Sequence, residues 1–173
     1  MLNNFIRGVI DGSLSTLGVL IGASAGNFNI IVSAGIGGAI ANGISNMLGA
    51  FTAEKARQYE DLRKVERAMV STSLKDTLLD KRIGPEVKKA GFVDGIATIL
   101  GGLVPVMPYF FFDTLQAMFI AVLTVLFLLF FLGIYIGKLS KENIMISATK
   151  MVVFGVVIAL IAYGIQIFFT PPA

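Results

Sequence analysis

The chain has 173 residues, of which 55% are hydrophobic and only 14% charged, and its formal net charge is +3. It contains no cysteine, histidine or tryptophan, which excludes disulfides and thiolate metal sites and removes the commonest general base. A soluble domain would carry about a quarter charged residues. The composition therefore predicts an integral membrane protein, and we expect neither enzymatic activity nor a nucleic acid partner.

The first half of the chain predicts two membrane-spanning helices followed by a charged segment. Residues 12–53 carry no charged side chain. As one helix they would be about 60 Å long, twice the ~30 Å hydrocarbon core, so we expect a break at Gly26-Asn27-Phe28-Asn29. Residues 54–91 hold ten Lys or Arg and seven Asp or Glu, with helical spacing of apolar residues. We expect Ser71-Thr72-Ser73 and Asp76 to restart a short helix, which Gly84-Pro85 ends.

The second half predicts three more spans, at 95–112, 115–137 and 151–169. The first of these carries Pro105 and Pro108 near its far end, and Asp113-Thr114 caps the second. We therefore predict an all-α polytopic membrane protein with five transmembrane helices and a short helical segment between the second and third. Its parts are 1–53 with two spans, 54–91 with the charged segment, and 92–173 with three spans.

The basic residues predict the orientation in the membrane. All fourteen Lys and Arg lie at Arg7, within 54–91, or at Lys138, Lys141 and Lys150, whereas the turns at 26–29 and 108–114 contain none. With five spans, every basic segment falls on one face of the bilayer. The positive-inside rule makes that face cytoplasmic, so the N-terminus and 54–91 are expected in the cytoplasm and the C-terminus on the opposite side.

An internal repeat relates the first and third spans. Residues 8–20 read GVIDGSLSTLGVL and residues 91–103 read GFVDGIATILGGL, so that Asp11 and Gly12 recur as Asp94 and Gly95 at an offset of 83. Both copies open a span on the same side, which predicts a parallel repeat, one of the known building plans of transporters.

Polar residues on the first three spans are candidates for a site. Asp11 and Ser15 share a face of the first helix, and Asn42 and Asn46 share a face of the second, with Met47 alongside. A carboxylate within a membrane span is costly and is a functional candidate by default, which applies to Asp11 and Asp94. The alternative is that each aspartate caps its helix, and that the asparagines only join helices through hydrogen bonds.

Gly18, Gly22 and Gly26 form a doubled small-xxx-small pattern on the first helix, where we expect another helix or a second copy of the chain to pack.

At these residues the chain resembles the vacuolar iron transporter family, which includes the yeast vacuolar iron and manganese carrier and nodulin-21-like proteins. The resemblance covers nearly the whole chain in order. The matching segments are Asp11-Gly12, Ser45-Asn46-Met47-Leu48-Gly49, the charged segment, Gly102-Leu103-Val104-Pro105-Val106-Met107-Pro108-Tyr109 and Ala162-Tyr163-Gly164.

The resemblance implies a dimeric carrier that moves Fe²⁺ or Mn²⁺ out of the cytosol in exchange for protons. It implies that Asp11 lines the path near the dimer axis and that a methionine and a glutamate on the second span assist it. Two features depart from the family. Its Gly-Glu-Tyr is Gly49-Ala50-Phe51 here, and its glutamate-rich metal-binding helices correspond to the short, net basic 54–91, where Glu54 and Glu60 are the remaining candidates for metal collection.

Our leading hypothesis is a homodimeric divalent-metal transporter in a lipid membrane, with no tightly bound cofactor and Fe²⁺ or Mn²⁺ as the transported substrate. Asp11 binds the cation, Asn46 and Met47 are neutral ligands, and Ser15, Asn42 and Asp94 lie along the path. Oxygen-rich sites without cysteine suit these metals. The alternative is a non-transporting scaffold that holds a partner or anionic lipid through its basic segment.

Overall fold

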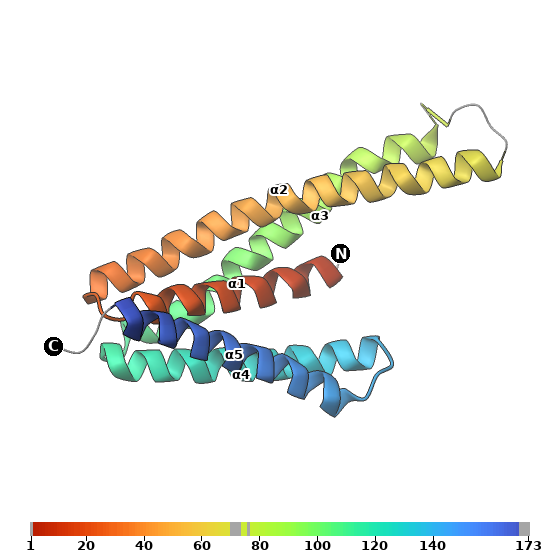
Figure 1. Ribbon diagram of the computed structural model, residues 1–173. Coiled ribbons are helices and arrows are strands. Elements are labelled where there is room, and N and C mark those ends of the chain that lie inside the picture. The colour runs from red at the N-terminus through yellow and green to blue at the C-terminus, as the bar shows by residue number, and fades with distance from the viewer. Residues whose placement is uncertain (1, 70–73, 76, 170–173) are drawn as a thin grey trace.

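The computed structural model describes residues 2–69, 74–75 and 77–169, and within them five long helices and no strand. Figure 1 shows their arrangement. They are α1 (Leu2–Gly22), α2 (Phe28–Ala68), α3 (Leu78–Leu103), α4 (Thr114–Leu139) and α5 (Ile144–Phe169), with a 3₁₀ helix η1 (Val104–Phe110) continuing α3. Each of the five, counting α3 with η1, is long and apolar enough to cross a membrane. The predicted all-α fold with five spans is therefore confirmed.

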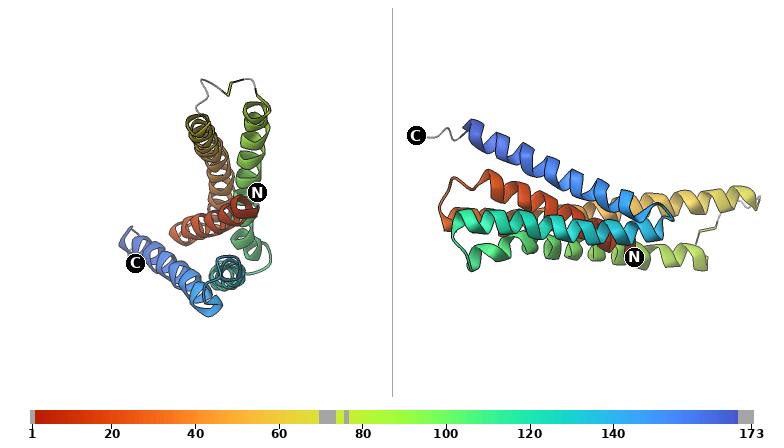
Figure 2. Two further views of the ribbon diagram at one scale, coloured as in Figure 1. Left: turned by 90° about the vertical axis from the view of Figure 1, so that its right-hand side faces the viewer. Right: turned by 90° about the horizontal axis from the view of Figure 1, so that it is seen from below.

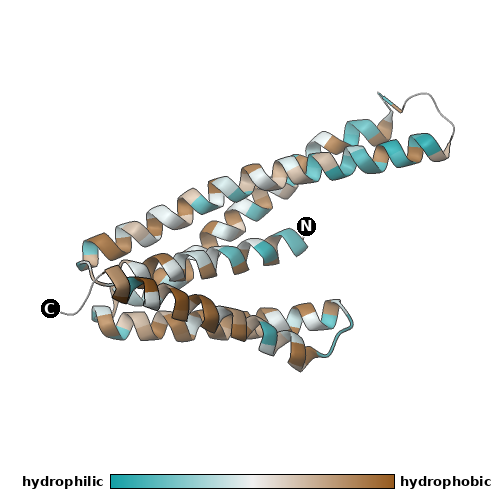
Figure 3. Ribbon diagram, viewed as in Figure 1, coloured by the Kyte–Doolittle hydropathy of each residue, from teal (hydrophilic) through white to brown (hydrophobic). Residues whose placement is uncertain are grey.

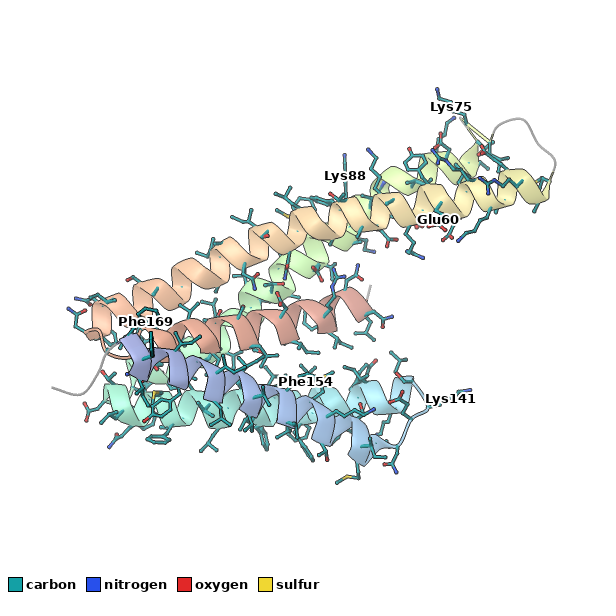
Figure 4. All side chains as sticks on the ribbon, in the orientation of Figure 1. Glu60, Lys75, Lys88, Lys141, Phe154 and Phe169 are labelled. Atoms are coloured by element: carbon teal, nitrogen blue, oxygen red, sulfur yellow. The ribbon has the colours of Figure 1, made fainter. Side chains whose placement is uncertain are left out.

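The charged parts of the chain gather at one end of the molecule. The start of α1, the end of α2 with the start of α3, and the turn between α4 and α5 all lie toward the right in Figure 1, where Figure 3 shows most of the hydrophilic ribbon. Lys75, Lys88 and Lys141, labelled in Figure 4, mark this end. We call it the basic end. The α1–α2 turn and the η1–α4 turn lie at the opposite end.

The prediction that Gly84-Pro85 ends a helix is wrong, and the second helix continues from the apolar stretch into the charged segment. α2 is a single helix of 41 residues, about 60 Å long, that continues past residue 53 into the charged segment. Its charged part is rich in Ala, Glu, Lys, Arg and Gln, which favour helix, and offers no breaker. α3 likewise passes through Gly84-Pro85. Ile83 and Val87 on either side are buried, and this packing outweighs the local cost of the proline.

Other boundaries shift less. Ser71-Thr72-Ser73 and Asp76, predicted to restart a helix, lie outside the described residues, and α3 has Thr77 as its N-cap. Asn27, within the predicted break, is the N-cap of α2, and its side chain accepts a hydrogen bond from the Ile30 N–H. Asp113 is the N-cap residue of α4, although its side chain makes no capping hydrogen bond. The fifth helix begins at Ile144, seven residues before the predicted start.

The glycines of the repeat bring α1 and α3 into close contact. A Cβ added at Gly8 would lie 2.5 Å from the Asp94 carbonyl oxygen, and one at Gly12 would lie 2.8 Å from the Thr98 carbonyl carbon and 2.9 Å from the Gly102 nitrogen. The contact partners advance along α3 as the glycines advance along α1, so the two helices run side by side in the same direction. This is the parallel arrangement that the repeat predicts.

α1 is the central helix, since it contacts α2, α3, α4 and α5. Toward the opposite end it lies in an apolar core that includes Leu17, Leu20 and Ile31. α5 lies at the periphery, as the two views of Figure 2 show, and Phe154 and Phe169, labelled in Figure 4, are 64% and 77% exposed on it. An apolar helix with so little protein cover is suited to contact with lipid tails.

Candidate functional site

Polar side chains from α1 and α2 meet around the carboxylate of Asp11. Its Oδ2 atom accepts hydrogen bonds from Asn42 Nδ2 at 3.0 Å and from Asn46 Nδ2 at 2.6 Å. Asn42 Nδ2 also donates to Ser15 Oγ at 2.8 Å. Residues 11 and 15, and residues 42 and 46, are each one helical turn apart, so each pair lies on one face. The two polar faces recognised in the sequence therefore lie against each other.

Asn46 extends this cluster to α3. Its Nδ2 atom donates a second hydrogen bond to Thr98 Oγ1 at 3.0 Å, and Thr98 Oγ1 donates to the Asp94 backbone carbonyl at 2.8 Å. Both asparagines thus use their amide nitrogens for two hydrogen bonds each. Among the described residues, the Oδ1 atoms of Asp11, Asn42 and Asn46 accept none. The cluster therefore retains three oxygen atoms with unused acceptor capacity.

The two repeated aspartates have different surroundings. Asp94 is 1% exposed and pairs with Arg7, whose Nε lies 3.1 Å from Oδ1 and whose Nη2 lies 3.0 Å from Oδ2. Asp11 is exposed on the surface of this single chain, and no ion pair within the described residues includes it. The charge of Asp94 is balanced by a guanidinium, whereas among the described residues the Asp11 carboxylate accepts hydrogen bonds only from the two asparagine amides.

Neither aspartate caps a helix, so the interpretation of the two aspartates as N-caps is wrong. α1 begins at Leu2, which places Asp11 nine residues, or about 14 Å, into the helix. α3 begins at Leu78 and Asp94 lies well inside it. The first-turn N–H groups that a cap would satisfy are therefore far from both carboxylates.

Three other candidates make contacts outside the cluster around Asp11. Met47 packs toward α3, since a Cβ added at Gly95 would lie 2.7 Å from Met47 Cβ. Glu54 accepts hydrogen bonds from Arg57 Nη2 at 2.6 Å and from Gln58 Nε2 at 2.7 Å. Glu60, labelled in Figure 4, pairs with the Lys64 ammonium at 2.8 Å. In the described part of the chain, no group of three or more Asp or Glu side chains comes together.

The three glycines of the small-residue pattern do not share one helical face. Gly18 and Gly22 lie on α1, and a Cβ added at either would meet no atom within 4 Å. Gly26 lies in the turn after α1, where its neighbours are Ala23 and Ile30. The surface of α1 that carries Asp11, Ser15 and these first two glycines is therefore open in the single chain.

Arg7 is the residue whose importance the sequence did not reveal, because its position was explained by membrane orientation alone. A signal was nevertheless present. Arg7 lies one helical turn before Asp11, and the repeat places Ala90 at the corresponding position of α3. Only the first copy of the repeat has an arginine at this position, and the fold places that arginine against the aspartate of the second copy.

These features define a class: a multi-pass helical membrane protein with a carboxylate and amide cluster between its first two membrane-spanning helices. The VIT family model matches residues 2–82 and 52–166, and this chain belongs to that family. It is 44% identical over 164 residues to the uncharacterized protein MJ0645 of Methanocaldococcus jannaschii, which covers 93% of this chain and 86% of that protein. It is 24% identical over 210 residues to vacuolar iron transporter 1 of Tulipa gesneriana, covering 95% of this chain and 85% of that protein.

Proposed function

We propose that this protein is a transporter that moves Fe²⁺ or Mn²⁺ out of the cytosol in exchange for protons, and that it works as a homodimer. Membership of the VIT family and the likeness to a protein named as a vacuolar iron transporter support a metal ion as the cargo. The cluster around Asp11 supplies oxygen ligands for such an ion.

The proposal rests on the surroundings of the Asp11 carboxylate. It lies within an apolar span and accepts two amide hydrogen bonds, and no cationic side chain within the described residues pairs with it. A carboxylate in a membrane span is a functional-site candidate, because an unpaired charge there is costly. A bound cation or a proton would each neutralise it, which makes Asp11 suited to carry the two in alternation.

The donor set favours a hard or borderline divalent ion. Oδ1 of Asp11, Asn42 and Asn46 are oxygen ligands, and the amide N–H groups hold the carboxylate in place. Oxygen ligands without thiolates suit Mn²⁺ and Fe²⁺ rather than Cu⁺. Met47 packs toward α3, so we assign it a packing role ahead of a ligand role.

The open surface of α1 supports a dimer. Asp11 and Ser15 are exposed polar groups on an apolar span, and Gly18 and Gly22 beside them leave room for close approach. Polar side chains facing lipid tails are unfavourable, and small residues let helices pack together. A second copy presenting the same surface would cover both aspartates and bring two carboxylates to one path.

Orientation and direction follow from the charges. The basic end carries Lys75, Lys88 and Lys141, labelled in Figure 4, and basic loops face the cytoplasm in membrane proteins. Metal therefore approaches Asp11 from the basic end and leaves at the opposite end.

Reconstituted vesicles loaded with a metal-sensitive dye test this proposal. Wild-type protein is expected to carry Mn²⁺ or Fe²⁺ into the vesicles, and Asp11→Asn to abolish this uptake while the protein remains folded. The matched control is Asp113→Asn, because Asp113 is an exposed carboxylate at the opposite end whose side chain makes no capping hydrogen bond. Equal metal uptake by wild type and Asp11→Asn would show that Asp11 is not part of the transport path.

The scaffold alternative makes a contrasting prediction. A ligand that binds only the folded state raises its stability, so Mn²⁺ should raise the Tm of a transporter in detergent and leave that of a scaffold unchanged.

A further inference from the structure

Asp94 is a buried carboxylate that the proposed transport does not use. It is 1% exposed, and Arg7 contacts both of its oxygens, from Nε at 3.1 Å and from Nη2 at 3.0 Å. A guanidinium that meets both oxygens of a carboxylate is held in a defined orientation. The side chain of Arg7 is nevertheless 58% exposed, so the pair has one fixed, buried member and one accessible member.

Arg7 also stands next to the path to Asp11. It precedes Asp11 by one helical turn, and the two residues line the same cavity of about 520 Å³ between α1 and the end of α4, with Asn3 and Ser140 also in its wall. Opposite charges one helical turn apart attract each other, so the Asp11 carboxylate is a second possible partner for the guanidinium. A cation that approaches Asp11 from the basic end through this cavity therefore passes Arg7.

Two carboxylates thus compete for one guanidinium. If Arg7 turned to Asp11, it would neutralise that carboxylate and occupy the place of a metal ion, as a tethered competitor. Asp94 is well placed to prevent this, because Gly8 and Gly12 hold α3 against α1 and Thr98 fixes the backbone of Asp94. The third span has Ala90 at the position of Arg7, so the chain holds no second arginine at the equivalent place in the repeat.

We propose that Asp94 is a positioning residue that holds Arg7 away from Asp11 and thereby keeps Asp11 free to bind the metal ion. This inference rests on the proposed function, since it concerns the same site. The repeat then has a division of roles: one aspartate binds the cargo, and the other binds the arginine that would compete with it.

The test measures Mn²⁺ affinity from the rise in Tm of purified protein in detergent, with Tm in the absence of metal recorded separately. In Asp94→Asn the guanidinium loses its charged partner and is expected to turn to Asp11. The Kd for Mn²⁺ should then rise about tenfold to a hundredfold, the range that a hydrogen bond to a charged group supplies. Removing the competitor as well, in Arg7→Gln/Asp94→Asn, should return the Kd to within about threefold of wild type.

A purely structural role for the pair gives a different result. Asp94→Asn would then change Tm without metal and leave the Kd for Mn²⁺ unchanged, which would overturn the inference. Failure of Arg7→Gln/Asp94→Asn to recover affinity would overturn it as well. If Asp94→Asn does not yield monodisperse protein, Arg7→Lys/Asp94→Asn replaces it. That variant should bind Mn²⁺ more weakly than Arg7→Gln/Asp94→Asn, and equal affinity would count against the inference.

The same experiment separates this inference from the proposed function. Asp11→Asn is included, and it should lose Mn²⁺-dependent stabilisation. If wild type gains no stability from Mn²⁺, or Asp11→Asn gains as much as wild type, the proposed function and the inference both fall. If wild type and Asp11→Asn behave as expected while Asp94→Asn binds like wild type, the proposed function stands and only the role of Asp94 is refuted.

Discussion

The contact between α1 and α3 at Gly12 allows a stringent test of the packing that builds the site. In Gly12→Ala, the added Cβ would overlap the Thr98 carbonyl oxygen and lie 2.8 Å from its carbon. Carbon atoms in contact are about 3.5–4.0 Å apart, so the two helices must separate by about 1 Å. Overpacking of this kind costs about 1–3 kcal/mol.

A matched control isolates this cost. Ala is the better helix former by up to about 1 kcal/mol, and Gly164→Ala on α5 gains the same propensity, but its Cβ meets no atom within 4 Å. At about 2–4 °C per kcal/mol for a chain of this size, the Tm of Gly12→Ala should lie about 2–12 °C below that of Gly164→Ala. Thermal unfolding in detergent measures both variants.

The separation of α1 and α3 in Gly12→Ala should also disturb the cluster around Asp11. Thr98 accepts its hydrogen bond from Asn46 at 3.0 Å, and Asn46 in turn holds Asp11, so a shift of α3 away from α1 loosens the cluster. Mn²⁺ uptake by Gly12→Ala should fall together with its Tm. A Tm equal to or above that of Gly164→Ala would refute the close approach of α1 and α3.

Three further predictions follow from the described contacts. Arg7→Ala leaves the buried Asp94 carboxylate unpaired and should cost about 3–5 kcal/mol of unfolding free energy in detergent, most of which Arg7→Ala/Asp94→Asn recovers; similar stability of the single and double variants would argue against the pair. Gly18→Leu adds a side chain at an open position, so it should not lower the Tm of the monomer but should lower the dimer fraction in light scattering after gel filtration, and an unchanged dimer would place the interface elsewhere. Glu60→Gln removes an exposed ion pair with Lys64 and should change neither Tm nor Mn²⁺ uptake. A large loss of uptake would instead indicate that Glu60 collects metal ions.

Local patterns in the sequence were sufficient for the membrane architecture. Hydropathy over about twenty residues is a property of a segment by itself, so the five spans could be recognised without knowing their neighbours. The polar face of α1 and the polar face of α2 were likewise visible, because residues one turn apart in a helix must share a side. Asp11, Ser15, Asn42 and Asn46 indeed lie in one hydrogen-bonded cluster.

Helix ends were harder to predict, since packing between helices competes with local signals. Gly84-Pro85 is a strong local breaker, yet α3 continues through it where Ile83 and Val87 are buried. Likewise, charge alone suggested a separate segment after residue 53, although charged residues that favour helix simply prolong α2.

The sequence by itself determined the five apolar spans, the gathering of basic residues at one end, and the repeated Asp-Gly of the first and third spans. It made Asp11 and Asp94 equivalent. Only the tertiary structure separated them, by placing Arg7 on Asp94, 87 residues away, and leaving Asp11 to the amides of α2. The physical reason is that an ion pair depends on how closely two helices approach, and here Gly8 and Gly12 set that distance.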